Sequence, residues 1–291
     1  MRFEKFSFID RSGKKVKFSC DKLKLANRFG ANLNSPPIFF DKEVLEKYYN
    51  HPSKYSVEDG ALFYGRIWMI HIDNNQQDCV MVYLGDLGEM PNEEQKHWKQ
   101  HNLLKQSGIS ETSFKRDFKA EFCSPEEPVL FFKEKFGSFN GKWKEKFGWF
   151  LFKPLNAEDE HHWKSLKIPA EEQKEFDEKI LSLTKIIIDS LDIIKMKENL
   201  IYDENDKSIL IFDKYLEQKH KFKSPGAIQY LKNLQELRSK GSAHRKANDF
   251  QKTYKEFDKG NFAETFKQNI IGAITLINTL ENNLLREKNE N

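Results

Sequence analysis

Residues 176–194 read FDEKILSLTKIIIDSLDII, and their apolar positions recur at the spacing of one face of an α-helix. From Phe176 to Ile194 the steps between these positions are 4, 3, 4, 4 and 3 residues. Side chains three and four residues apart lie on the same face of a helix. Acidic residues, which complement the dipole at a helix N-terminus, precede the stretch at Glu171, Glu172 and Glu175. The stretch therefore predicts a long helix with one buried face.

Two more stretches downstream have the same period. Ser224-Pro225 opens a second helix over residues 225–240, whose apolar side chains fall on one side. We expect Gly241 to end it. Residues 262–284 repeat apolar positions in steps of 4, 4, 3, 4, 3 and 4. A shorter helix is expected over 242–257. Amphipathic helices bury their apolar faces against one another, so this part of the chain predicts a helical bundle.

The sequence before this region has a different composition and is rich in Phe, Trp, Gly and Pro. The expected strands, rich in β-branched and aromatic residues, cover residues 3–8, 16–18, 67–72 and 79–84. We expect the last two to form an antiparallel pair. Short helices are expected over 41–49 and 92–101, each opened by a capping residue. The predicted architecture is an α+β domain of unknown role (sensor or regulatory) over residues 1–168, followed by an all-α bundle over 169–291.

The composition excludes several classes of protein. The chain has 291 residues, of which 38% are apolar and 32% charged, so it is neither disordered nor a membrane protein. The N-terminus lacks the apolar stretch of a secretory signal. Three scattered cysteines form no CxxC motif, which excludes a zinc finger and fits a reducing cytosol. The sequence therefore predicts a cytoplasmic protein.

One histidine pair invites a metal interpretation. His161 and His162 follow the acidic residues 158–160. Adjacent side chains point in different directions, and the i, i+4 spacing of helical metal ligands is missing. We therefore expect no metal and no cofactor.

Charge is unevenly distributed within the predicted bundle. Residues 171–206 hold 5 Lys/Arg and 11 Asp/Glu, which gives a net charge of −6. Residues 219–259 hold 11 Lys/Arg and 4 Asp/Glu, which gives +7. The basic density of this second region would attract an anion such as a nucleic-acid phosphate.

The centre of the basic region, residues 237–246, reads LRSKGSAHRK. We expect Arg238 in the last turn of a helix and His244 at the start of the next segment. Histidine can accept and donate a proton near neutral pH, and the guanidinium fork of arginine matches two phosphate oxygens. This pair suits cleavage of RNA without a metal, because the 2′-hydroxyl of the substrate is itself the nucleophile.

Arg238 and His244, with five residues between them, match the R-x(4–6)-H motif, and the chain from about residue 170 to 291 resembles the HEPN superfamily. That resemblance implies an all-α, dimeric, metal-independent endoribonuclease of toxin or anti-phage defence systems, with a composite active site at the dimer interface. The residue after the arginine is often Asn, Asp or His in that superfamily, and here it is Ser239. The N-terminal part, with YLGDLG at 83–88 and FGW at 147–149, resembles uncharacterised bacterial proteins.

The resemblance implies roles for the motif residues. Arg238 would bind the scissile phosphate and His244 would transfer a proton, while the side chains expected to grip RNA phosphates are those of Lys240, Arg245 and Lys246. The expected partners are an RNA substrate, a second copy of the chain, and a regulatory partner or phage trigger. An alternative stays open: the bundle is a non-catalytic dimerisation or RNA/nucleotide-binding module, with Ser239 marking lost activity.

Overall fold

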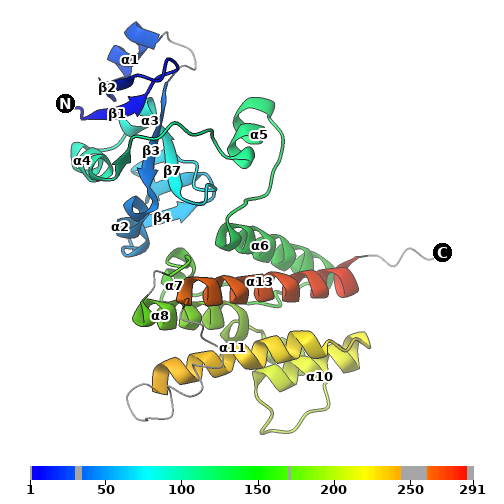
Figure 1. The fold of residues 1–291 in the computed structure, drawn as a ribbon. Coiled ribbons are helices and arrows are strands. Elements are labelled where there is room, and N and C mark those ends of the chain that lie inside the picture. Colours follow the sequence, from blue (N-terminus) through cyan, green and yellow to red (C-terminus); the bar gives the residue numbers. More distant parts are fainter. Residues whose placement is uncertain (1, 30–34, 170–171, 244–260, 287–291) are drawn as a thin grey trace. The chain divides into compact units, whose positions relative to one another are not determined.

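The computed structural model describes residues 2–29, 35–169, 172–243 and 261–286. The chain forms two compact units, Met1–Leu130 and Phe131–Asn291 (Figure 1). Every strand that the described residues form belongs to the first unit, and the second is built from helices. The predicted order, an α+β region followed by a helical region, is thus confirmed.

Three small antiparallel sheets form the N-terminal unit. Their strands are β1 Lys5–Ile9, β2 Lys15–Ser19, β3 Pro37–Asp41, β4 Tyr55–Glu58, β5 Ala61–Tyr64, β6 Trp68–His71, β7 Cys79–Tyr83 and β8 Asn102–Leu103. The sheet orders are β1-β2, β7-β3-β8 and β4-β5-β6. Asp10 closes the β1–β2 hairpin, because its carboxylate accepts hydrogen bonds from the backbone N–H groups of Ser12 and Lys14.

The predicted pairing of residues 67–72 with 79–84 is wrong. β6 pairs with β5, and β7 pairs with β3, so the two segments lie in different sheets. An isolated bridge between Asp73 and Met81 joins the start of the connecting region to β7. The sequence around β3 and β5 did not stand out as strand, which left β6 and β7 as the apparent partners.

Short helices pack around these sheets. They are α1 Lys22–Phe29, η1 Lys42–Leu45, α2 Glu46–Tyr49, α3 Leu84–Leu87, α4 Asn92–Gln100 and α5 Glu111–Lys119. The helices expected over 41–49 and 92–101 are confirmed. Asp41 caps the first by accepting the N–H of Glu43, whereas the second follows Pro91 and has no side-chain cap. The Trp98 indole lies edge-on to Phe40, with ring centroids 4.8 Å apart, at the centre of the core.

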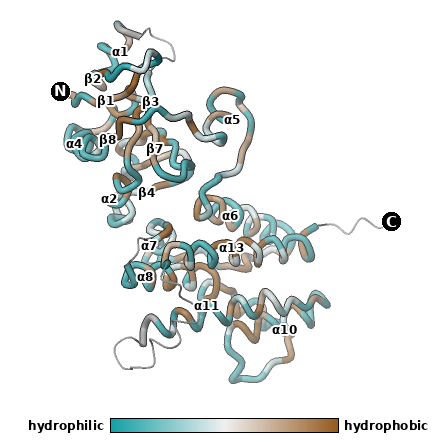
Figure 2. The backbone as a smooth tube through the Cα atoms, in the orientation of Figure 1, coloured by the Kyte–Doolittle hydropathy of each residue, from teal (hydrophilic) through white to brown (hydrophobic). Residues whose placement is uncertain are grey.

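The C-terminal unit is a helical assembly. Its elements are α6 Pro128–Phe147, α7 Glu160–Lys164, α8 Gln173–Thr184, the π-helical turn η2 Lys185–Asp189, α9 Ile193–Lys197, α10 Ser208–His220, α11 Pro225–Ala243, α13 Phe262–Leu280 and the π-helical turn η3 Glu281–Leu285. α8, α11 and α13 pack against one another, and α10 packs against α9 and α11. Figure 2 shows hydrophobic residues alternating with hydrophilic ones along these helices.

The apolar periodicities are largely confirmed by burial. The predicted positions from Phe266 to Leu284 on α13 and η3, and those of α11, are buried. The α8 series is buried as far as Leu191, but Ile194 is 77% exposed. The reason is that the helix ends with η2 at Asp189. The next helix, α9, begins only at Ile193 and buries a different face, so Ile194 does not continue the buried series.

Two further helix predictions need correction. α10 was not anticipated, because its apolar run from Ile209 to Phe212 is consecutive and hides the helical spacing of its buried residues. α11 continues through Gly241 to Ala243. One glycine inside a helix costs only about 1 kcal/mol relative to alanine, which a packed helix tolerates.

The two units divide at 130/131, earlier than the predicted boundary at 168/169. The reason is that α6 and the segment after it belong to the helical assembly. The Asn140 side chain makes hydrogen bonds to both the N–H and the carbonyl of Phe152, and Phe152 forms a β-bridge with Leu191. Lys142 of α6 pairs with Glu281 of η3. The Phe- and Gly-rich composition of α6 concealed its helical character.

Candidate functional site

Arg238 lies on α11 and is held by an acidic residue that is distant in sequence. Its Nη1 donates hydrogen bonds to both carboxylate oxygens of Asp189, at 3.0 and 2.9 Å. Both side chains are about one-third exposed, at 32% and 34%. The guanidinium is therefore fixed in orientation at the surface of the bundle, where solvent reaches it.

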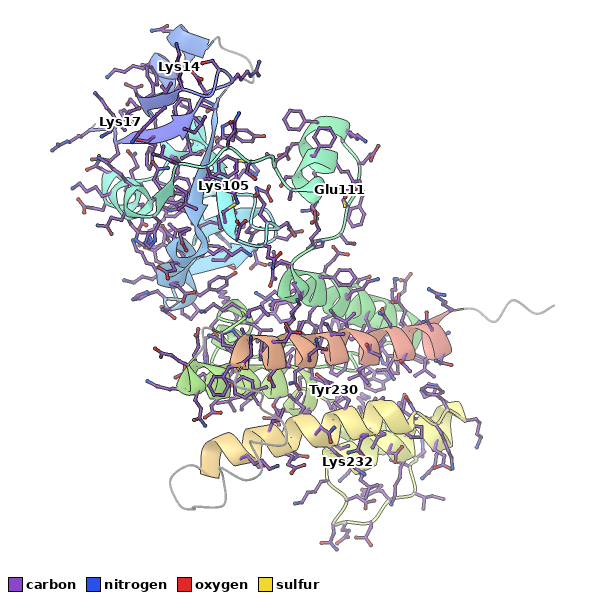
Figure 3. The ribbon with its side chains drawn as sticks, viewed as in Figure 1. Lys14, Lys17, Lys105, Glu111, Tyr230 and Lys232 are labelled. Carbon is purple, nitrogen blue, oxygen red and sulfur yellow. The ribbon has the colours of Figure 1, made fainter. Side chains whose placement is uncertain are left out.

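Packing of α11 determines where Arg238 emerges. Leu234 and Leu237 of the same helix are buried. The side chain of the adjacent Arg238 therefore projects from the helix at the edge of its buried face. Tyr230, labelled in Figure 3, fixes the helix further back, because its hydroxyl donates to the Asn269 carbonyl of α13 at 2.9 Å. Its ring lies over Gly272, where a Cβ would come within 2.5 Å of it.

Asp189 ends the π-helical turn η2. A π turn adds a residue to the helical repeat, and such turns frequently occur at functional sites. The buried Ile186, Ile187 and Ile188 anchor η2 in the core, which leaves Lys185 and Asp189, four residues apart, on the outer side. Their charged atoms are 3.8 Å apart.

These contacts extend into a network of five side chains that we call the charged cluster: Asp159, His162, Lys185, Asp189 and Arg238. The Lys185 ammonium lies 3.6 Å from Asp159, and Asp159 lies 3.8 Å from His162 Nε2. His162 Nδ1 is 3.0 Å from the Ser182 hydroxyl oxygen. The two cations and the two carboxylates of the cluster cancel in charge. An anionic ligand would therefore have to displace one of the carboxylates.

His162 is a member of this cluster that the sequence did not reveal. Its side chain is buried, and burial, the adjacent His161, and the cations Lys185 and Arg238 lower its pKa to about 4, against an opposing effect of Asp159. The imidazole is therefore neutral at pH 7. The sequence offered these two histidines only as metal ligands, whereas the structure places one of them beside the arginine of the motif.

Acid should destabilise the protein through His162. In the unfolded state the histidine binds a proton with a pKa near 6.5, whereas in the folded state it does so only near pH 4. The free energy of unfolding therefore falls as the pH drops from about 6.5 to about 4. The full effect is roughly 3 kcal/mol. His162→Gln keeps a hydrogen-bond partner for Ser182. Its free energy of unfolding should fall less between pH 7 and pH 4.5 than that of the wild type. Denaturant titrations at pH 7 and pH 4.5 measure it, and identical losses in both proteins would contradict the assignment.

The structure places only part of the predicted site. The Lys240 ammonium pairs with Glu236 one turn back at 2.6 Å, and the Ser239 hydroxyl donates to the Gln235 carbonyl. His244, Arg245 and Lys246 lie outside the described residues, so the predicted juxtaposition of Arg238 and His244 stays a prediction. What the structure brings to Arg238 instead is Asp189 and the rest of the charged cluster.

The N-terminal unit has a separate polar pocket of about 190 Å³. The Arg116 guanidinium in its wall is 2.7 Å from Asp59 and also donates to the Cys123 carbonyl. The buried Asp73 carboxylate accepts the N–H of Ser110 at 2.7 Å. Burial raises the pKa of Asp117 at its rim. The charged groups of Arg116, Asp59 and Asp73 thus each have a partner among the residues around the pocket.

Comparison of the chain with family models, curated proteins and solved structures returns no significant match. Across the described ranges, no helix is long and apolar enough to cross a membrane. The same residues contain no group of three or more His, Cys, Asp or Glu side chains placed to hold a metal ion. The function is therefore inferred from the residues of the charged cluster and the motif.

Proposed function

We propose that the protein is a metal-independent endoribonuclease of a toxin or anti-phage defence type, with its active site on the C-terminal bundle. The observation that carries the proposal is the Arg238 guanidinium, partly exposed and oriented by Asp189 through both carboxylate oxygens. A guanidinium held in this way is preorganised for a phosphate, since its orientation is fixed before the ligand arrives. His244 follows six positions later in the sequence.

The chemistry assigned to these residues needs no metal. Arg238 stabilises the charge that develops on the phosphoryl oxygens, while His244 either accepts the proton of the 2′-hydroxyl or donates one to the leaving 5′-oxygen, and a water molecule carries out the other proton transfer. The 2′-oxygen attacks the adjacent phosphorus, the bond to the 5′-oxygen breaks, and the product carries a 2′,3′-cyclic phosphate. Lys240, Arg245 and Lys246 are the proposed contacts to neighbouring phosphates.

Incubation of the purified protein with RNA in EDTA tests the proposal. RNA should be cut to products ending in a 2′,3′-cyclic phosphate or its opened form, and a DNA of the same sequence should stay intact because it lacks the nucleophile. Cleavage of DNA at an equal rate, or cleavage only after magnesium is added, would contradict the mechanism.

The ion pair also favours a second candidate function, a non-catalytic RNA- or nucleotide-binding module. Asp189 neutralises Arg238, and a phosphate must displace or share that carboxylate. A protein that binds RNA but does not cut it under any of the above conditions would support this alternative.

Both candidates predict salt-dependent RNA binding. The net +7 charge of residues 219–259 attracts phosphates, and each phosphate neutralised on single-stranded RNA adds about 0.7 to the slope of log affinity against log salt concentration. We expect a slope of at least 2 for a contact of about three phosphates. A filter-binding titration measures it, and a flat response would remove RNA as the ligand.

The composite site implied by the family resemblance requires a homodimer. The bundle leaves large apolar side chains exposed on different helices, Leu210 at 43% and Ile271 at 41%, which a second copy could cover. Light scattering at micromolar concentration should therefore give twice the 34.5 kDa mass of the chain. A monomer at the highest attainable concentration would contradict the composite site. A regulatory partner or phage trigger acting through the N-terminal unit completes the proposal.

A further inference from the structure

An open groove of about 370 Å³ lies on the C-terminal unit, between α6, α7 and the segment that follows α6. Its walls include the aromatic rings of Phe136, Phe150 and Trp163. Phe136 and Trp163 have ring centroids 5.5 Å apart and are inclined at 50°. All three rings are only partly buried, so each offers a face or an edge to a ligand in the groove.

Part of the groove's lining is bare helix backbone. Gly137 and Gly141, one turn apart on α6, both line it, and a Cβ built on either would meet no atom within 4 Å. A flat ligand can therefore approach the backbone of α6 closely between the aromatic walls. The two glycines weaken a helix that has no other evident need of them.

Two lysines give the groove a positive rim. Lys153 lines it directly, and the Lys144 ammonium lies 4.6 Å from the centroid of the Phe150 ring. Neither ammonium has an ion-pair partner in the part of the chain that the structure describes. The one carboxylate of the lining, Glu160, is paired with Lys164 at 3.0 Å. An aromatic ligand that carries negative charge fits this combination, and a nucleotide is such a ligand.

The groove adjoins the charged cluster. Glu160 and Ile186 line the groove, and each directly follows a member of the cluster, Asp159 and Lys185. These two members contact each other at 3.6 Å, which joins α7 to η2 at this point. A strand of RNA with a phosphate at Arg238 would thus pass beside the groove.

From this placement we propose that the groove is a subsite for an unpaired nucleotide of the RNA substrate, with its base against Trp163 and Phe136 and its phosphate near Lys153. The subsite rests on the proposed ribonuclease function and deepens it, because it makes a single-stranded region the preferred substrate. Stacking on aromatic side chains accepts any base, so the subsite selects for an unpaired nucleotide and does not read sequence.

Filling the groove tests the subsite. Gly141→Leu places a side chain in the lining of the groove, where its Cβ has open space, and improves helix propensity. Ser138→Leu puts the same side chain on an exposed position of α6 outside the groove and is the matched control. The probes are a short fluorescein-labelled 2′-O-methyl RNA, which lacks the attacking hydroxyl, and an abasic strand of the same length. Anisotropy titrations measure binding, and circular dichroism checks folding.

We expect Gly141→Leu to weaken binding of the RNA about tenfold, to leave binding of the abasic strand unchanged, and Ser138→Leu to match wild type. Lys153→Gln, a second variant that needs no change in the helix, should reduce the salt slope by about 0.7. Equal RNA affinity of Gly141→Leu and wild type, an equal loss in Ser138→Leu, or no RNA binding at all would overturn the subsite. The ribonuclease function is tested separately by the EDTA cleavage assay. The subsite and the ribonuclease function can therefore each fail without the other.

Discussion

Replacing Arg238 by alanine should reduce RNA cleavage about 10²–10³-fold, since loss of one preorganised donor to a developing oxyanion has an effect of that size. The fold should survive the change. The side chain is one-third exposed, and Asp189 keeps the Lys185 ammonium at 3.8 Å as a partner. Initial rates of cleavage of a labelled RNA in EDTA measure the loss, and thermal melting confirms folding.

His244→Ala should reduce cleavage by roughly 10²–10⁴-fold, because it removes the group that transfers the proton. Loss of the wild-type pH dependence of the rate should accompany it, which a structural role would not produce. Wild-type cleavage by either alanine variant would contradict the assignment of the motif.

Two conservative variants separate phosphate recognition from simple charge. Arg238→Lys keeps the positive charge but replaces the planar fork by a point charge, so it should not restore full activity. Asp189→Asn keeps one acceptor oxygen for the guanidinium but removes the negative charge that competes with phosphate. It should preserve RNA binding while lowering the cleavage rate through a less fixed guanidinium. Full activity in Arg238→Lys would show that orientation of the fork is irrelevant.

Phe266→Ala should destabilise the C-terminal unit by about 3–5 kcal/mol. The ring is fully buried on α13, the helix that packs against both α8 and α11. Removing it takes away the transfer free energy of the ring and leaves a cavity that rigid helices fill only in part. Denaturant unfolding followed by circular dichroism at 222 nm measures the effect, because the long helices of this unit supply most of that signal.

Lys267→Ala is the control on the same helix. That side chain is 45% exposed, so the change should stay within about 0.5 kcal/mol. Similar losses in the two variants would mean that α13 does not bury the face that the structure assigns to it. A selective loss in Phe266→Ala would tie the stability of the bundle to the apolar period of residues 262–284.

Sequence alone determined the parts of the fold that depend on local pattern. The repeat from Phe266 to Leu284 identified a helix and its buried face correctly, because both follow from the 3.6-residue turn. The strands β1 and β2 were likewise evident from local composition, and Asp10 takes part in the turn between them. α10 was missed although its buried residues Ile209, Phe212 and Leu216 recur at helical spacing, because the unbroken apolar run from Ile209 to Phe212 hides that period.

Only the tertiary structure decided which distant residues meet. Asp189 lies 49 positions before Arg238, and no spacing rule links them. The pairing arises because α8 and α11 pack against each other and the π-helical turn presents the carboxylate at that contact. His162 joined the same cluster through α7. Local periodicity specifies which face of a segment is buried, whereas packing between segments specifies its neighbours, and the charged cluster and the groove are properties of those neighbours.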